Sequence, residues 1–200
     1  MSRVVFLPGA GGDPAFWKPV ADRLGPSIDA VRLAWPGLGH VPPRDDVRGF
    51  DDLVRLTLET MDRPVDLVAQ SMGGVVAIRA ALARPDRVRR LVLAATSGGI
   101  DVNALGAADW RPDYRRDFPQ AAPWVFEPVA DVTDRVPSIT APALLIWGDA
   151  DPISPVAVGR RLGSLLPHAT LVVIRAGDHA FARARADEVA PYVGSFLAAP

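Results

Sequence analysis

Short apolar runs alternate along this chain with longer stretches in which apolar residues recur at helical spacing. Runs of this length that glycine or proline bounds are typical of buried strands. We predict six strands, at residues 4–7, 29–35, 65–69, 88–95, 143–147 and 169–174. Because these runs are apolar throughout instead of alternating with polar residues, they indicate a sheet that is covered on both faces.

The stretches between the runs predict the helices. Helical spacing covers residues 13–24, 50–61 and 73–84, and a further helix runs to about residue 166 with Ser154 as its N-cap and Pro155 at its first position. We expect Asp187 to cap a closing helix. Strands that alternate with helices predict an α/β fold with a mostly parallel sheet and helices on both faces.

This alternation stops at Ser97, and residues 101–138 contain no clear strand. This segment contains prolines, an Arg115-Arg116 pair and five aromatic residues, namely Trp110, Tyr114, Phe118, Trp124 and Phe126. Long insertions in compact α/β domains are usually functional or flexible. We therefore expect a short helical lid after the fourth strand; the alternatives are a pair of helices that cover the last strands and a dimer contact.

Composition narrows the chemistry. The 200 residues, 49% of them hydrophobic, suit one core and one domain over residues 1–200. A net charge of -1 argues against nucleic-acid or membrane partners. The chain has no cysteine, and its three histidines lack metal-ligand spacing, so we expect neither a metal nor a cofactor. No apolar segment is long enough to span a bilayer, which favours a cytoplasmic protein.

One stretch suggests a nucleophile. Residues 65–69 run straight into Ala69-Gln70-Ser71-Met72-Gly73, and a helical pattern follows at once. A serine at such a strand-to-helix turn adopts a strained backbone, which small flanking residues permit. The pattern matches G-x-S-x-G with Ala69 in the first glycine position. Alone, it could equally be a loop that ends a buried strand.

Other strand ends supply what a serine nucleophile needs. In a parallel sheet, active residues collect beyond the carboxyl ends of the strands. Four loops lie there, at residues 9–12, 70–73, 148–151 and 177–179. Together they offer backbone N–H groups, a serine, an acid and an imidazole, which are the parts of an acyl-transfer site.

With these motifs in this order, the sequence resembles the α/β-hydrolase family from residue 4 to residue 197. The matching segments are 7–12 (LPGAGG), 35–39 (WPGLG), 69–74 (AQSMGG), 147–155 (WGDADPISP) and 177–179 (GDH). The resemblance implies that Ser71 is the nucleophile, His179 the general base and acid, and the N–H groups of Ala10 and Met72 the oxyanion hole. Departures from the family pattern are Pro8 in place of a histidine, Ala69 in place of glycine, and Gln70 where histidine is frequent.

Two roles have rival candidates. The family's G-x-x-D-x-x-x-P pattern favours Asp151 as the orienting acid over Asp101 and Asp149. His168 precedes a strand at the opposite end of the sheet, and His40 precedes the nucleophile in the sequence.

We therefore predict a serine carboxylesterase that cleaves a small ester or thioester through an acyl-enzyme, with an ester-like small molecule as partner. Alternatives on the same residues are a C–C bond hydrolase, an enol-lactonase, a perhydrolase or a hydroxynitrile lyase. A catalytically silent protein that binds a ligand is the alternative from another class. We expect Gln70, Trp124 and Phe181 to line the substrate pocket, and Arg115 with Arg116 is a candidate pair for binding a substrate carboxylate. The oligomeric state does not follow from the sequence.

Overall fold

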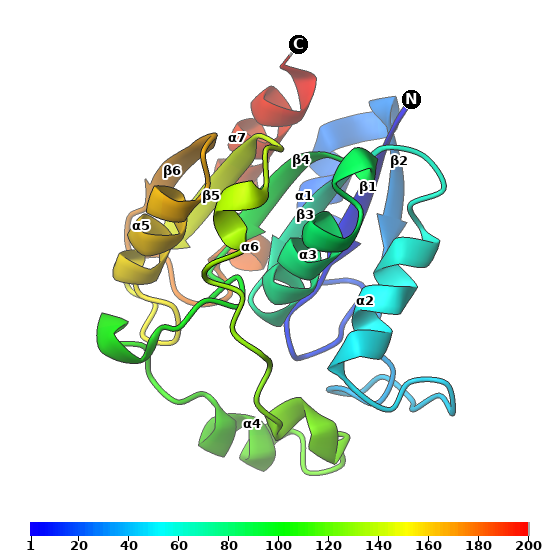
Figure 1. Ribbon diagram of the computed structural model, residues 1–200, viewed down its shortest axis with the longest axis vertical. Coiled ribbons are helices and arrows are strands. Elements are labelled where there is room, and N and C mark those ends of the chain that lie inside the picture. The colour runs from blue at the N-terminus through cyan, green and yellow to red at the C-terminus, as the bar shows by residue number, and fades with distance from the viewer. Residues whose placement is uncertain (200) are drawn as a thin grey trace.

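The computed structural model describes residues 1–199, with the backbone alone at Ser27. Its strands form one sheet in the order β2-β1-β3-β4-β5-β6, and every neighbouring pair is parallel (Figure 1). The strands are β1 Ser2–Leu7, β2 Ile28–Arg32, β3 Val65–Gln70, β4 Val88–Ala94, β5 Ala143–Gly148 and β6 Ala169–Ile174. The predicted α/β sheet is confirmed. Only β2 ends clearly earlier than predicted, because the Trp35 N–H donates to the carbonyl of Gly12, in the loop after β1, at 3.1 Å.

Helices cover both faces of the sheet (Figure 1). They are α1 Lys18–Leu24, α2 Phe50–Glu59, α3 Met72–Ala83, α4 Arg111–Asp117, α5 Val156–Leu165, α6 Phe181–Ala184 and α7 Ala186–Ala198. Successive β1 residues point to opposite faces, as the pleat requires. Val5 and Leu7 pack with α2, α3 and α5, whereas Val4 and Phe6 pack with α1 and α7. The fold therefore has two apolar cores, one on each side of the sheet.

Three helix starts differ from the prediction because polar side chains bond elsewhere. Asp13 accepts the Ala15 N–H at 2.8 Å and forms a turn, so α1 begins only at Lys18. Ser154 is not the cap of α5, since its hydroxyl accepts the Trp147 indole N–H at 3.1 Å. Asp187 does not cap α7 either. It lies in the first turn of that helix and pairs with Arg23 at 2.6 Å.

The segment from residue 101 to residue 138, called the insert below, follows β4 as expected. It holds α4 and three short 3-10 turns, Asn103–Leu105, Pro123–Phe126 and Val136–Ser138. In Figure 1, α4 lies beyond the carboxyl ends of the strands. It covers the loops after β1 and β2, where Tyr114 bonds to Ala10 and Gly39. This position over the sheet edge agrees with a short helical lid, and not with helices packed on the last strands.

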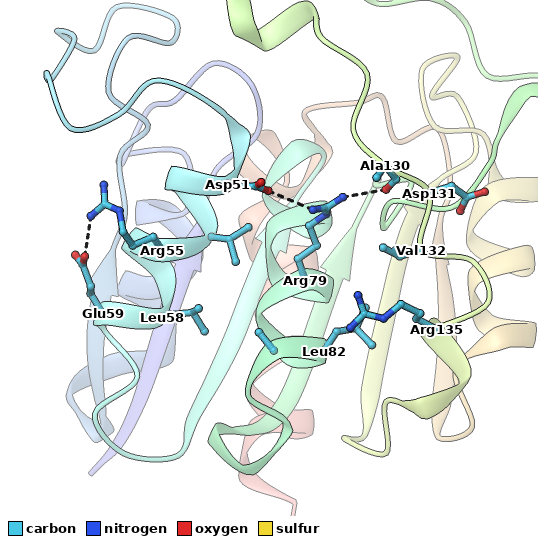
Figure 2. Close-up of a pocket in the computed structure, with 12 residues that line it drawn as sticks. Asp51, Arg55, Leu58, Glu59, Arg79, Leu82, Ala130, Asp131, Val132 and Arg135 are labelled. Atoms are coloured by element: carbon cyan, nitrogen blue, oxygen red, sulfur yellow. Dashed lines mark hydrogen bonds and ion pairs between the residues drawn. The ribbon is translucent and has the colours of Figure 1, made fainter.

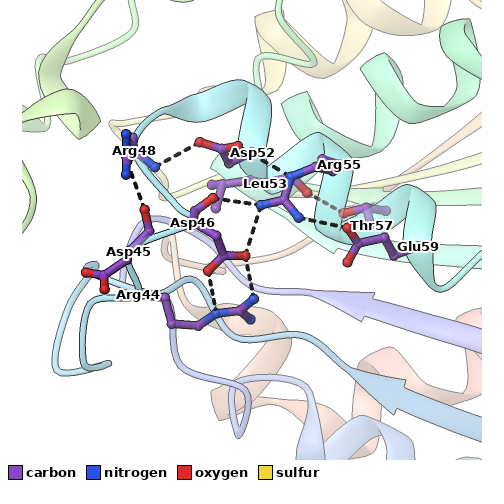
Figure 3. A network of polar contacts seen from close by, with 9 residues as sticks. All are labelled: Arg44, Asp45, Asp46, Arg48, Asp52, Leu53, Arg55, Thr57 and Glu59. Atoms are coloured by element: carbon purple, nitrogen blue, oxygen red, sulfur yellow. Dashed lines mark hydrogen bonds and ion pairs between the residues drawn. The ribbon is translucent and has the colours of Figure 1, made fainter.

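A polar network fixes the loop that leads into α2 (Figure 3). Arg44 donates two hydrogen bonds to Asp46, at 3.0 and 2.7 Å, and Arg55 of α2 reaches Asp46 and Glu59. Hydrogen bonding to Arg44 lowers the pKa of Asp46, so this carboxylate stays charged at neutral pH. The network holds the proline-rich loop after Gly39 against α2.

No helix within residues 1–199 combines the length and the apolar character that crossing a membrane requires.

Candidate active site

Ser71 stands at the sharp turn between β3 and α3. Its φ is 51°, which is uncommon and strained for a residue other than glycine. Three hydrogen bonds hold this backbone: the Ser71 N–H donates to Ala94 at 3.0 Å, and the Ser71 carbonyl accepts from Gly74 at 2.9 Å and from the Thr96 hydroxyl at 2.6 Å. The strain is thus supported by neighbouring elements, and the side chain is directed into a cavity.

Gly73 lets the start of α3 approach the end of β1. A Cβ at this position would lie 2.4 Å from the Pro8 carbonyl oxygen and 2.7 Å from that of Leu7. Both contacts are with backbone, which has little freedom to move away. Glycine at the second small position of the serine motif is therefore a packing requirement, and it keeps the loop after β1 beside Ser71.

A continuous chain of hydrogen bonds joins Ser71, His179 and Asp151. His179 Nε2 lies 3.0 Å from Ser71 Oγ, and His179 Nδ1 lies 2.8 Å from Asp151 Oδ2. The Asp151 side chain is fully buried, and its Oδ1 accepts the N–H groups of Ile153 and Ser154. An ionised Asp151 accepts from Nδ1–H, so Nε2 is left with its lone pair toward the serine hydroxyl.

The loops after β5 and β6 carry Asp151 and His179 and are bonded to each other. The Ala150 N–H donates to the Gly177 carbonyl at 3.0 Å. From the other side, Gln70 Nε2 donates to the His179 carbonyl at 3.1 Å. His179 is therefore held both through its imidazole ring and through its backbone carbonyl.

The rival candidates lie apart from this chain. Asp149 is exposed and accepts the Ala176 N–H at 2.5 Å, and exposed Asp101 accepts the Asn103 N–H at 2.9 Å. His40 packs edge-on against Phe118, with ring centroids 5.1 Å apart, and His168 is exposed before β6. Among residues 1–199, the His179 ring nitrogens form hydrogen bonds with Ser71 and Asp151 alone.

Most carbonyl oxygens at the end of β1 and in the loop after it already accept a hydrogen bond from the protein. The Trp17 indole donates to Leu7 at 3.0 Å, the Trp35 indole donates to Pro8 at 2.8 Å, and the Gly12 N–H donates to Gly9 at 3.0 Å. In the described part of the chain, no hydrogen bond of a loop or turn has the N–H of Ala10 or Met72 as its donor. Two backbone donors beside Ser71 are thus left for a ligand.

A cavity of about 980 Å³ opens over Ser71 and His179. Gln70 and Trp124 line it, together with Ala10, Met72 and insert residues such as Trp110. Phe181 does not line it, and its assignment to the pocket is wrong. Its ring is 1% exposed and packs in the core on the α1 and α7 side of the sheet.

The Arg115-Arg116 pair does not line the cavity either. Arg115 lies over the Phe126 ring, 4.1 Å from its centroid, and Arg116 pairs with Asp113 and Asp117. Both guanidinium groups are therefore engaged within the insert, so binding of a substrate carboxylate by this pair has no support in the structure.

A second hollow of about 700 Å³ lies beside α2 and α3 (Figure 2). Arg79 spans it and donates to Asp51 at 3.2 Å and to the Ala130 carbonyl at 3.0 Å. Its lining has no serine or histidine, so it offers no nucleophile and base. In residues 1–199, no group of three or more His, Cys, Asp or Glu side chains is placed to hold a metal ion.

The sequence analysis did not predict the contacts of four residues that support the site. They are Trp17, Trp35 and Tyr114, which bond to carbonyls of the loop after β1, and Thr96, which bonds to the Ser71 carbonyl. Polar groups in otherwise apolar surroundings were the available signal, because a buried N–H or O–H must find an acceptor. Which acceptor it finds depends on tertiary structure.

Known proteins resemble this chain over nearly its whole length. The sequence model of a family described as "Alpha/beta hydrolase family" matches residues 4–192. A pimeloyl-[acyl-carrier protein] methyl ester esterase of Aliivibrio salmonicida is 23% identical, over 98% of this chain and 92% of the relative. A poly(3-hydroxyalkanoate) depolymerase of Ectopseudomonas oleovorans is 27% identical, over 98% of this chain and 84% of the relative.

Solved structures share the fold. A thermophilic esterase from Thermogutta terrifontis superposes with a TM-score of 0.79 at 21% identity, covering 98% of this chain and 89% of the other. A meta-cleavage product hydrolase from Pseudomonas fluorescens IP01 gives a TM-score of 0.80 at 19% identity, covering 98% and 90%. At these identities the likeness concerns the fold alone.

Proposed function

We propose that this chain, which belongs to the alpha/beta hydrolase family, cleaves a small carboxylic ester or thioester through an acyl-enzyme on Ser71. The chain is an esterase-type hydrolase, as the names of its relatives indicate. The observation that carries the finer proposal is the hydrogen-bonded series Ser71, His179 and Asp151, which ends in a cavity that Ala10 and Met72 also line.

In the acylation step, Ser71 Oγ attacks the carbonyl carbon of the ester while His179 Nε2 takes the hydroxyl proton. Asp151 stabilises the imidazolium that results. The substrate oxygen becomes an oxyanion, to which the N–H groups of Ala10 and Met72 donate. The C–O or C–S bond of the ester then breaks, and His179 gives its proton to the leaving alcohol or thiol.

Deacylation repeats these steps with water. His179 takes a proton from a water molecule, whose oxygen attacks the acyl carbon bound to Ser71. The same two N–H groups hold the second oxyanion. When the bond to Ser71 Oγ breaks, the proton returns to the serine and the carboxylic acid leaves.

The direct test is hydrolysis of p-nitrophenyl acetate and butyrate by the wild-type chain, with hydroxylamine added as a competing nucleophile. An acyl-enzyme predicts that more of the acyl group is recovered as hydroxamate than hydroxylamine forms with the same ester in the absence of the protein. Release of p-nitrophenol no faster than in buffer would reject the proposal.

Charge around the cavity predicts a preference for neutral substrates. Carboxylates outnumber cations in its lining, where Arg111 is the one arginine or lysine among the described residues. Arg116 and Arg183, from outside the lining, pair with three of these carboxylates, so the balance stays negative. The lining carboxylates are Asp13, Asp101, Asp109, Asp113, Asp117, Glu127 and Asp131. A cleft lined by one sign of charge repels ligands of that sign, and salt screens the effect.

We expect kcat/KM for a p-nitrophenyl ester with a terminal carboxylate on its acyl chain to be about tenfold lower than for the neutral ester of equal length. The difference should shrink as salt is added. Arg115→Ala is the control, because Arg115 lies over the Phe126 ring and does not line the cavity, and it should leave the ratio of the two substrates unchanged. An anionic ester that is hydrolysed faster, with selective loss in that variant, would contradict the prediction.

A further inference from the structure

Tyr114, from α4 of the insert, reaches the loop after β1. Its hydroxyl donates to the Ala10 carbonyl at 2.7 Å and accepts from the Gly39 N–H at 3.0 Å. We propose that Tyr114 is a positioning residue that holds Ala10 by its carbonyl and, through the backbone of that residue, also limits the movement of the Ala10 N–H, and so completes the oxyanion hole from the insert. This inference rests on the proposed function, in which the Ala10 N–H binds the oxyanion.

The Tyr114 side chain is built for this position. It is buried, and its ring packs against Trp110, Phe118 and Phe126, with centroid distances of 5.4, 4.9 and 5.9 Å. Burial raises the pKa of Tyr114 above its usual value, so the hydroxyl keeps its proton at neutral pH and can donate it to a carbonyl. Both its donor and its acceptor functions are used.

The two loops that Tyr114 joins also touch each other. A Cβ at Gly39, whose φ is 54°, would lie 2.0 Å from the Gly11 carbonyl oxygen. The Trp35 N–H donates to Gly12 at 3.1 Å. The hydroxyl therefore sits between two backbones that are already in contact, and a small change there moves the peptide groups of Ala10 and Gly11.

The side chains that form hydrogen bonds to the end of β1 and the loop after it come from different parts of the fold. Trp17 and Trp35, which hold the carbonyls of Leu7 and Pro8, are both fully buried in the cores beside the sheet. The Ala10 carbonyl accepts its hydrogen bond from Tyr114, a residue of the insert. The Ala10 carbonyl thus depends on the insert, while the carbonyls of Leu7 and Pro8 depend on the cores beside the sheet and that of Gly9 on the Gly12 N–H within the loop.

Loss of this hydroxyl should affect the transition state more than the ground state. Oxyanion donors act on charge that develops during the reaction, and removing a whole donor costs about 10²- to 10³-fold in kcat. Tyr114→Phe keeps the ring and the Ala10 N–H but frees the loop. We expect kcat for p-nitrophenyl butyrate to fall about tenfold, with KM changed by less than about twofold.

Two variants serve as controls. Tyr192→Phe removes the hydroxyl of the other tyrosine, which is 43% exposed on α7. Phe126→Leu thins the aromatic packing around Tyr114 but leaves its hydroxyl in place. Both should keep the wild-type kcat. An equal fall of kcat in Phe126→Leu would assign the effect to packing and overturn the proposal.

Amide hydrogen exchange gives a readout that does not need activity. In Tyr114→Phe, exchange should become faster at Gly39 and in residues 9–12, and the melting temperature should fall by only a few degrees, because the buried Gly39 N–H loses its acceptor. Exchange and kcat both equal to wild type would refute the role of Tyr114 while leaving the proposed function intact. A wild-type protein that neither hydrolyses esters nor reacts with a fluorophosphonate would instead refute the proposed function. In that case, unchanged exchange in Tyr114→Phe would also refute the positioning role of Tyr114.

Discussion

Ser71→Ala is expected to lower kcat for p-nitrophenyl butyrate by about 10⁴- to 10⁶-fold, because the variant has no oxygen to attack the ester carbonyl. In the wild-type chain this oxygen lies 3.0 Å from His179 Nε2, within reach of the proton transfer that activates it. Steady-state kinetics with purified protein measures the loss. The residual rate should come from the oxyanion donors and from binding alone.

The fold of Ser71→Ala should stay intact. The three hydrogen bonds that hold the turn use the backbone of residue 71, and alanine keeps them. Ser164→Ala is a matched control, since Ser164 is exposed on α5 and bonds only to the Arg161 carbonyl in the described chain. The melting temperatures of both variants should be close to that of the wild type. Activity of Ser71→Ala within tenfold of wild type would contradict the assigned nucleophile.

Asp151→Asn is expected to lower kcat by about 10⁴-fold with little change in structure. The asparagine Oδ1 can still accept from Ile153 and Ser154, but its amide N–H₂ would face His179 Nδ1. The imidazole would then carry its proton on Nε2, which is the wrong tautomer to accept the Ser71 proton. The loss should appear in kcat, measured over a range of pH.

Asp149→Asn separates this role from a general effect of charge near the site. Asp149 is exposed in the same loop, and an asparagine there can still accept the Ala176 N–H. Its kcat should stay within about threefold of wild type. A greater loss in Asp101→Asn than in Asp151→Asn would move the orienting role to the loop after β4.

The sheet and the proximity of the candidate catalytic residues were predictable because both depend on one strong pattern, the continuous apolar runs. Continuous apolar runs such as residues 143–147 indicate strands that are buried on both faces, and parallel strands bring their carboxyl ends to one edge. Ser71, Asp151 and His179 each follow such a run. Their proximity follows from topology without any knowledge of side-chain contacts.

Roles that depend on the choice of a tertiary partner were not predictable. Ser154 has the residue type of an N-cap, but the Trp147 indole is buried seven residues earlier and takes its hydroxyl. Asp187 bonds to Arg23 from a helix far away in the sequence. Phe181 follows His179 closely, yet the short α6 turns its ring into the core instead of the cavity.

The contacts of the insert were not predictable from the sequence either. Its aromatic residues were visible in the sequence as candidates for a lid, but no periodicity said which loop they would cover. The contact of Tyr114 with Ala10 spans 104 residues, and only the folded chain brings the two together.

Covalent labelling tests the central claim most directly. The wild-type chain is treated with a fluorophosphonate, its intact mass is measured, and the modified peptide is identified by fragmentation. A serine activated by His179 predicts a single adduct on Ser71, which is absent in Ser71→Ala and strongly slowed in Asp151→Asn. An unmodified wild-type chain, or an adduct on another residue such as Ser97, would contradict the assignment of Ser71 as the nucleophile.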